Sequence, residues 1–199
     1  MTNILYISSS ATGENSFSLP LGKAIVEKLQ LANPDNKLFE HNLLRNPLPH
    51  ITETHLTAFA TPAGQRSPEL QEAVLLSDKA IAELMKADIV VIGAPLYNFG
   101  IPSALKAWID HIARVNLTFR YTEQGPEGLV KGKKVYLAIA TGGVYSEGPM
   151  QAYDFVTPYL KAILGFIGMT DITVFRAEGT AIPGLKEKVL KKAIAAIRL

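Results

Sequence analysis

The 199-residue sequence contains no cysteine, and this absence excludes disulfides, thiolate nucleophiles and thiolate metal ligands. A chain without cysteine also fits a cytoplasmic location. Residues 1–7 lack both the basic region and the cleavage site of a signal peptide. No uninterrupted apolar run approaches the ~20 residues that span a membrane. We therefore expect a cytoplasmic protein with no membrane partner.

An excess of charge of either sign is missing as well. The 20 basic and 18 acidic residues leave a net charge of only +2. The basic residues are dispersed, apart from a cluster at 186–192 that is typical of the solvated face of a helix. Because nucleic-acid binding needs a concentrated basic surface, we expect no nucleic-acid partner.

Clusters of metal ligands are also missing. Two of the four histidines, His50 and His55, lie in the segment 43–66, and no group of carboxylates accompanies them. A metal ion needs several imidazole or carboxylate ligands at suitable spacing, so we expect no metal site. A third histidine, His111, lies well inside a predicted helix and is interpreted as a structural residue.

Hydrophobic residues make up 48% of the chain, which is enough for one sizeable core. The length is that of one α/β domain, so we assign residues 1–199 to a single domain. Short apolar runs predict strands at 3–8, 37–42, 88–94, 133–140 and 171–178. Apolar residues at helical spacing predict helices at 18–32, 67–86, 103–115, 153–167 and 184–198. This alternation predicts an α/β fold with a doubly wound, five-stranded parallel sheet of order 2-1-3-4-5.

Two segments show no helical or strand periodicity. The segment 43–66 contains Pro47, Pro49, Pro62 and Gly64, and its length is typical of a functional flap or a partner-facing loop. In the segment 117–129, glycines and a proline interrupt any regular pattern, so we expect an irregular excursion from the sheet.

The loop after the first predicted strand is rich in hydroxyl groups. Ser10, Ser16 and Ser18 precede or begin the first helix, where backbone amides and the helix dipole favour an anion. The loop has neither a GxGxxG pattern nor a Walker lysine, so it is not a dinucleotide fingerprint or a P-loop. Its composition suits a phosphate monoester held by neutral donors. The alternative is a polar surface loop in which Ser18 only caps the helix.

Two further loops follow the third and fourth strands. The first, at 95–103, carries Tyr97, Asn98 and Phe99, which suit a flat, conjugated ligand with polar edges. The second contains Gly142 and Gly143, which allow close approach of the backbone to a ligand. Ordinary strand-to-helix loops are the alternative for both. In the predicted strand order all three loops meet at the carboxyl edge, which favours one ligand with a phosphate tail and a flat ring.

Three motifs together resemble one known family. They are Pro95-x-Tyr97-Asn98-Phe99, the segment 118–129, and Leu164-Gly165-Phe166-Ile167-Gly168. They resemble the bacterial FMN-dependent NADH azoreductases, which are flavodoxin-like proteins related to the NAD(P)H quinone dehydrogenases. The resemblance covers essentially the whole chain. It implies a homodimer that holds FMN non-covalently near its interface and reduces quinones and azo compounds in a ping-pong cycle, with NADH or NADPH as co-substrate.

The resemblance also implies roles for particular residues. It assigns cofactor contacts to Ser10, Ser16, Phe17 and Ser18 at the phosphate, to Leu96, Tyr97, Asn98 and Phe99 along the ring, and to Ala140, Thr141, Gly142 and Gly143 at the pyrimidine end. We further expect Tyr121, Phe166 and Tyr145 in the substrate pocket. Because the flavin carries the chemistry, no catalytic side chain is expected. The chain departs from the family pattern at Leu96, where many members have methionine, and at Ala140-Thr141, where some have Ser-Arg.

Two other functions share this fold, a flavodoxin-type electron carrier and a flavin-free regulatory domain. Carriers usually present an acidic surface around the flavin, and the weakly basic composition favours the enzyme instead. The sequence identifies neither the physiological acceptor nor the preferred nicotinamide cofactor. We expect a homodimer, because a patch of apolar residues would be exposed to water in a single chain. These patch residues are Phe119, Tyr121, Phe155, Tyr159, Leu164 and Phe166.

Overall fold

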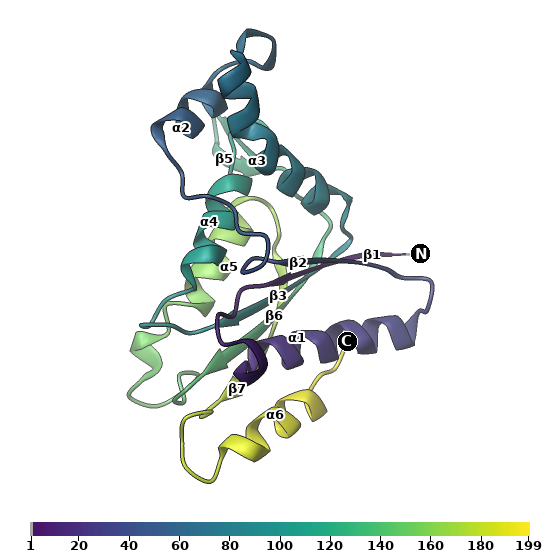
Figure 1. Ribbon diagram of the computed structural model, residues 1–199. Helices are drawn as coiled ribbons and strands as arrows, with labels where there is room; N and C mark the ends of the chain where they lie inside the picture. Colours follow the sequence, from purple (N-terminus) through teal and green to yellow (C-terminus); the bar gives the residue numbers. More distant parts are fainter. Residues whose placement is uncertain (1) are drawn as a thin grey trace.

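Five parallel strands form the central sheet of the computed structural model, which describes residues 2–199 apart from the side chain of Glu187 (Figure 1). The strands are β1 (Asn3–Ser8), β2 (Lys37–Asn42), β3 (Ile89–Pro95), β6 (Lys134–Thr141) and β7 (Asp171–Glu178). Their order is β2-β1-β3-β6-β7, and each neighbouring pair is parallel. The predicted order 2-1-3-4-5 matches only loosely, because two strands outside this sheet precede β6 in the chain.

Helices cover both faces of the sheet. Helices α1 (Ser18–Ala32) and α6 (Lys186–Ala195) lie on one face, at the bottom of Figure 1. Helices α3 (Pro68–Lys86), α4 (Ser103–Ile112) and α5 (Thr157–Phe166) cover the other face. The predicted helix at 153–167 was too long at its amino end, because residues 151–153 form a separate 3₁₀ turn. Likewise α6 is shorter at both ends than predicted.

The strands alternate their side chains between two cores, one on each side of the sheet. In β1, Leu5 and Ile7 join the core under α3, α4 and α5, whereas Ile4 and Tyr6 join the core under α1 and α6. Because both faces are buried, the strand sequence is apolar throughout instead of alternating with polar residues. Trp108 of α4 is a fully buried member of the first core.

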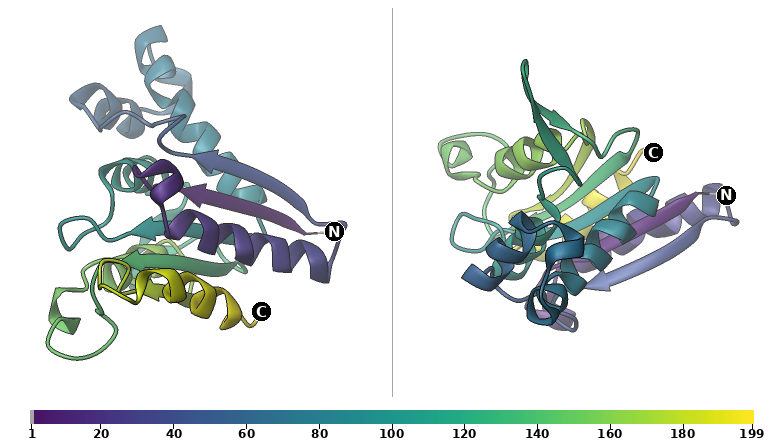
Figure 2. Two further views of the ribbon diagram at one scale, coloured as in Figure 1. Left: turned by 60° about the horizontal axis from the view of Figure 1, so that its bottom comes forward. Right: turned by 90° about the horizontal axis from the view of Figure 1, so that it is seen from above.

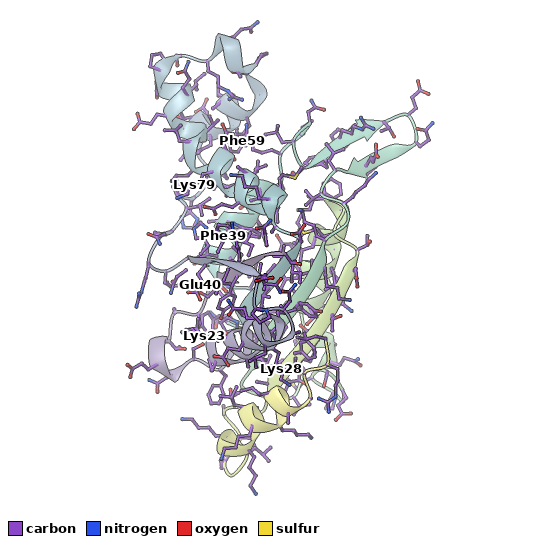
Figure 3. All side chains as sticks on the ribbon, turned by 90° about the vertical axis from the view of Figure 1, so that its right-hand side faces the viewer. Lys23, Lys28, Phe39, Glu40, Phe59 and Lys79 are labelled. Atoms are coloured by element: carbon purple, nitrogen blue, oxygen red, sulfur yellow. The ribbon has the colours of Figure 1, made fainter. Side chains whose placement is uncertain are left out.

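The segment 43–66 contains a helix that the sequence did not predict. Helix α2 (Glu53–Ala60) begins with a capping box, in which the amide of Thr52 donates to Nδ1 of His55 at 3.2 Å. The side chain of Phe59, labelled in Figure 3, connects α2 to α4, since the Arg114 guanidinium just after α4 lies 4.4 Å from the centroid of that ring. The usual capping box carries Glu or Gln at the third helical position, so a histidine there concealed the helix start.

The predicted irregular excursion at 117–129 is instead a β-hairpin. Strands β4 (Phe119–Thr122) and β5 (Gly125–Gly128) pair antiparallel and project away from the main sheet (Figure 2, right). Gly128 is required at the base of the hairpin, because a Cβ there would lie 2.2 Å from the amide nitrogen of Gly168. In residues 2–199 no helix has the length and apolar character needed to cross a bilayer.

Candidate functional site

Three loops meet where β1, β3 and β6 end, as the sequence predicted. The amide of Ser9 donates to the carbonyl oxygen of Gly93 at 3.2 Å, which joins the β1 loop to β3. The amide of Leu96 donates to the carbonyl oxygen of Ala140 at 2.8 Å, which joins the β3 loop to β6. The carboxyl edge of the sheet therefore carries one continuous site at its topological switch point.

The β1 loop gathers buried hydroxyl groups at the start of α1. Ser10, Ser16 and Ser18 are all buried, and the hydroxyls of Ser16 and Ser18 lie 3.4 Å apart. The hydroxyl of Ser16 accepts from the amide of Leu19 at 3.1 Å. The alternative in which Ser18 caps the helix is therefore wrong, since Ser18 is itself the first helical residue and Ser16 bonds the first turn.

A hollow of about 650 Å³ borders this loop. Its lining includes the serines Ser8, Ser10 and Ser16 together with Lys23 and Glu40, and the last two are labelled in Figure 3. Below it, the Tyr6 hydroxyl donates to the carbonyl oxygen of Leu19 at 2.9 Å. Burial, assisted by the nearby Glu40 carboxylate, raises the pKa of Tyr6 well above its ordinary value, so this phenol remains a neutral donor.

The β3 loop is a tight turn with unusual backbone angles. Asn98 and Phe99 have φ angles of 49° and 67°, in the left-handed region that non-glycine residues seldom occupy. Two hydrogen bonds of 3.0 Å between Tyr97 and Gly100 close the turn. Within residues 2–199 the amides of Asn98 and Phe99 donate to no protein acceptor. The turn thus presents two free donors at the site.

The diglycine loop after β6 is fixed from two directions. The buried hydroxyl of Thr141 donates to the carbonyl oxygen of Gly143 at 2.8 Å, and the same oxygen accepts from the amide of Gly179 at 2.9 Å. No acceptor in the described part of the chain receives the amide of Gly143. A Cβ on Gly143 would lie 3.2 Å from the ring of Tyr145, so glycine allows that ring to approach.

Aromatic rings form a wall beside the turn. The ring of Phe99 packs against Tyr145, with centroids 6.4 Å apart, and against Tyr153, at 5.3 Å. The amide of Phe155 donates to the carbonyl oxygen of Phe99 at 3.3 Å. The sequence did not single out Tyr153, because its position against Phe99 depends on the path of the loop that follows Gly143.

Two of the predicted substrate-pocket residues lie far from this wall in the same chain. Phe166 ends α5 and packs against Phe119 of the hairpin, with centroids 4.6 Å apart, near the amino edge of the sheet. Tyr121 lies on the hairpin and is 70% exposed. Of the three predicted residues, only Tyr145 lies at the carboxyl edge. Tyr121 and Phe166 are not brought to that edge within this chain.

The expected exposed patch is also smaller than the sequence indicated. Phe119 and Leu164 are buried within the chain, so they need no partner to cover them. Phe155 remains 57% exposed. It lines an apolar groove of about 790 Å³ together with Tyr97, Ile101 and Tyr159. In the described residues no three acidic or histidine side chains gather in a position to hold a metal ion.

The donor set of the site fits FMN. Buried neutral hydroxyls at a helix amino terminus match a phosphate, and the free amides of Asn98, Phe99 and Gly143 match the carbonyl edge of a flavin ring. A parallel sheet of this order with its site at the switch point defines the flavodoxin-like class. The family with the flavodoxin-like fold matches residues 2–199, and the chain belongs to that family.

The chain is also similar to curated proteins that are named as FMN-dependent NADH:quinone oxidoreductases. The chain is 50% identical over 182 residues to the FMN-dependent NADH:quinone oxidoreductase of Herminiimonas arsenicoxydans, which covers 92% of this chain and 89% of the relative. It is 48% identical over 201 residues to the enzyme of the same name from Burkholderia pseudomallei strain 1710b, covering 99% of this chain and 100% of the relative.

Two solved azoreductase structures superpose on nearly the whole of this chain. The azoreductase from Bacillus anthracis strain Sterne superposes with a TM-score of 0.90 at 32% identity, covering 98% of this chain and 96% of that one. The FMN-dependent NADH-azoreductase from Bacillus anthracis strain Ames Ancestor, solved in complex with FMN, superposes with a TM-score of 0.88 at 31% identity, covering 98% and 95%.

Proposed function

We propose that this chain is an FMN-dependent NAD(P)H oxidoreductase that reduces quinones and aromatic azo compounds by two-electron, ping-pong hydride transfer. The observation that supports this most directly is the meeting of buried serine hydroxyls with the left-handed turn at Asn98 and Phe99. The two relatives that match 92% and 99% of this chain are named as oxidoreductases instead of electron carriers.

Each part of the site has a proposed role toward FMN. Ser10, Ser16 and Ser18, with the first amides of α1, hold the phosphate, and Phe17 closes this end. The residues 96–99 lie along the ring, and 140–143 hold its pyrimidine end. The phosphate loop lacks a dinucleotide fingerprint, so the cofactor is FMN and not FAD.

Bound FMN supplies the capacity to accept a hydride from the nicotinamide and to pass two electrons to the acceptor. The protein provides position and electrostatics. Free amides of Asn98, Phe99 and Gly143 orient the ring and stabilise negative charge on it. The wall of Phe99, Tyr145 and Tyr153 keeps water from one side of the acceptor position. No side chain acts as nucleophile or base in hydride acceptance.

The active unit in this proposal is a homodimer in the cytoplasm. The hairpin that carries Tyr121 projects from the main sheet (Figure 2), and the side chains of Tyr121 and Phe155 are 70% and 57% exposed. A two-fold contact would bring Tyr121 and Phe166 of one chain toward the wall of the other and would bury exposed apolar side chains.

Two measurements test the proposal. The flavin released from the purified protein by heat is identified by chromatography, and we expect FMN; FAD, or no flavin after reconstitution trials, would contradict the assignment. NADH consumption is then followed with a quinone and with an azo dye, each at catalytic protein concentration. Repeated turnover is the expected result. Bound FMN without NADH consumption would identify a carrier instead.

A further inference from the structure

The loop between β6 and α5 is fastened at both ends by two charged residues of β7. Near its start, one carboxylate oxygen of Glu178 accepts from the amides of Tyr145 and Ser146, at 2.8 and 2.9 Å. Near its end, the Arg176 guanidinium donates to the carboxylate of Asp154 at 2.7 Å. The loop spans residues 142–156, and these bonds tie its two ends to β7.

Arg176 connects the two fastenings, because its guanidinium contacts the carboxylates of both Asp154 and Glu178. It lies two residues before Glu178 on β7, so both side chains leave the same face of the sheet. One guanidinium nitrogen bonds Asp154 and also the Thr157 hydroxyl, at 2.6 Å, and the other lies 3.5 Å from the Glu178 carboxylate. All three charged side chains are largely buried: Asp154 is 7% exposed, Arg176 20% and Glu178 13%.

The same carboxylates also shape the backbone. The Asp154 carboxylate accepts from the amides of Val156 and Thr157, at 3.1 and 3.0 Å, and so starts α5. Burial raises the pKa of Asp154, but the bonds from Thr157 and Arg176 outweigh burial, and the net pKa is lowered. Asp154 therefore remains an anion that can hold Arg176.

The fastened loop carries the aromatic wall of the site. Tyr145 lies at the Glu178 fastening and Tyr153 immediately precedes Asp154, and both rings pack against Phe99. The amide of Tyr145 is itself one of the two bonded to Glu178. Neither Glu178 nor Arg176 is among the residues proposed to contact FMN, so their effect on the site passes through the loop.

We propose that Glu178 and Arg176 are positioning residues, which set the aromatic wall and thereby determine which flat acceptors fit the pocket. This inference rests on the proposed function. A two-ring quinone covers more of the wall than a one-ring quinone does. Loosening the loop therefore raises the KM of the larger acceptor more than that of the smaller one, while FMN remains bound.

The test uses FMN-loaded protein and two readouts. The first is hydrogen exchange at the amides of Tyr145 and Ser146. In Glu178→Ala these amides lose their acceptor, so we expect exchange about tenfold faster or more. The second is the KM for a naphthoquinone and for a benzoquinone, and we expect about a tenfold rise for the former, a smaller rise for the latter and little change in FMN affinity.

Matched variants distinguish a positioning role of Glu178 from a nonspecific loss of structure. Glu178→Gln retains an oxygen for both amides, so protection and KM should stay close to those of the wild type. In Glu178→Asp the side chain is too short to reach both amides, so this variant should show the same changes as Glu178→Ala in milder form. It also provides the test if Glu178→Ala fails to fold. Asp171→Asn removes a β7 ion pair to Lys134 at the opposite edge, 2.6 Å long, and should change neither readout.

Unchanged exchange at Tyr145 and Ser146 in Glu178→Asp, or equal KM changes in Glu178→Asp and Asp171→Asn, would overturn the inference. The exchange readout does not require turnover. If the wild type binds FMN but reduces no quinone, the proposed enzymatic function fails, and exchange alone still decides whether Glu178 positions the loop.

Discussion

The hydroxyl oxygen of Tyr97 accepts a hydrogen bond from the backbone amide of Ala11, at 3.1 Å, across the gap between two loops of the site. The same hydroxyl lies 3.4 Å from that of Ser10. Tyr97 belongs to the turn proposed to contact the flavin ring, while Ala11 and Ser10 belong to the proposed phosphate loop. One side chain therefore links the two ends of the proposed FMN site.

Removing this coupling should weaken FMN binding. In Tyr97→Phe the ring remains but the bond to Ala11 is lost, so we expect a loss of about 1 kcal/mol, or roughly fivefold in Kd. Fluorescence titration of the apoprotein with FMN measures the change. Tyr153→Phe is the control, because Tyr153 is a 47% exposed tyrosine that has no role in joining the two loops. Equal effects of the two variants would contradict the role given to Tyr97.

The left-handed turn predicts that backbone shape at residue 98 matters more than its side chain. Glycine adopts the observed φ of 49° without cost, so Asn98→Gly should bind FMN almost as the wild type does. Alanine resists this conformation, so Asn98→Ala should lose about 1–2 kcal/mol of binding or stability. Titration with FMN and thermal melts compare the two. Severe loss of FMN in a folded Asn98→Gly variant would show that the amide side chain holds the ring.

The hairpin residue Tyr121 should act on the acceptor and not on the cofactor. If its ring covers the partner's pocket, Tyr121→Ala raises the KM for quinone about tenfold and leaves FMN bound. Leu31→Ala, which removes an exposed apolar side chain of α1, is the control. Sedimentation at micromolar concentration gives the accompanying mass. A fully active monomer there would exclude a shared pocket.

His111 should make the fold less stable in mild acid. Its Nε2 donates to the carbonyl oxygen of Pro49 at 2.9 Å, and its buried Nδ1 has no partner among residues 2–199. Burial lowers the pKa of His111 below its ordinary value of 6.5. The unfolded chain then takes up a proton first as the pH falls. The stability contribution is therefore complete above pH 6.5 and is lost as the pH falls toward the folded pKa.

Denaturant unfolding between about pH 8 and pH 5 checks this slope, which reaches at most about 1.4 kcal/mol per pH unit for one proton. His111→Gln keeps a donor for Pro49 but does not titrate, so its curve should be flatter than that of the wild type. The exposed His50 offers the control, and His50→Gln should retain the wild-type slope. A wild-type slope in His111→Gln would refute the prediction.

Periodicity predicted the main sheet because each strand is buried on both faces, as Leu5 and Ile4 of β1 illustrate. Periodicity did not predict α2 or the β4–β5 hairpin, because the residues there depart from the usual patterns. His55 replaced the Glu or Gln of a capping box and concealed α2. Pro126 and Gly128 suggested irregular chain, although a two-stranded hairpin with a free edge tolerates both.

The site was predicted at the level of loops, and the details depend on tertiary contacts. Strand order alone brings the hydroxyl loop beside Tyr97 and Gly143. Asparagine tolerates left-handed angles, but nothing local indicates that Phe99 adopts one as well, since the surrounding turn imposes it. Arg176 and Glu178 looked like ordinary strand residues. Two charges spaced by two at the carboxyl end of a strand are the signal that could have identified them.

In the proposed function, FMN in this site takes a hydride from NADH and returns two electrons to a quinone. The most direct test follows the visible absorbance of the bound flavin without oxygen, adding NADH first and quinone second. We predict that one equivalent of NADH bleaches the flavin and that one equivalent of quinone restores its colour. A flavin that NADH leaves coloured, or that stays bleached after quinone is added, would contradict the account.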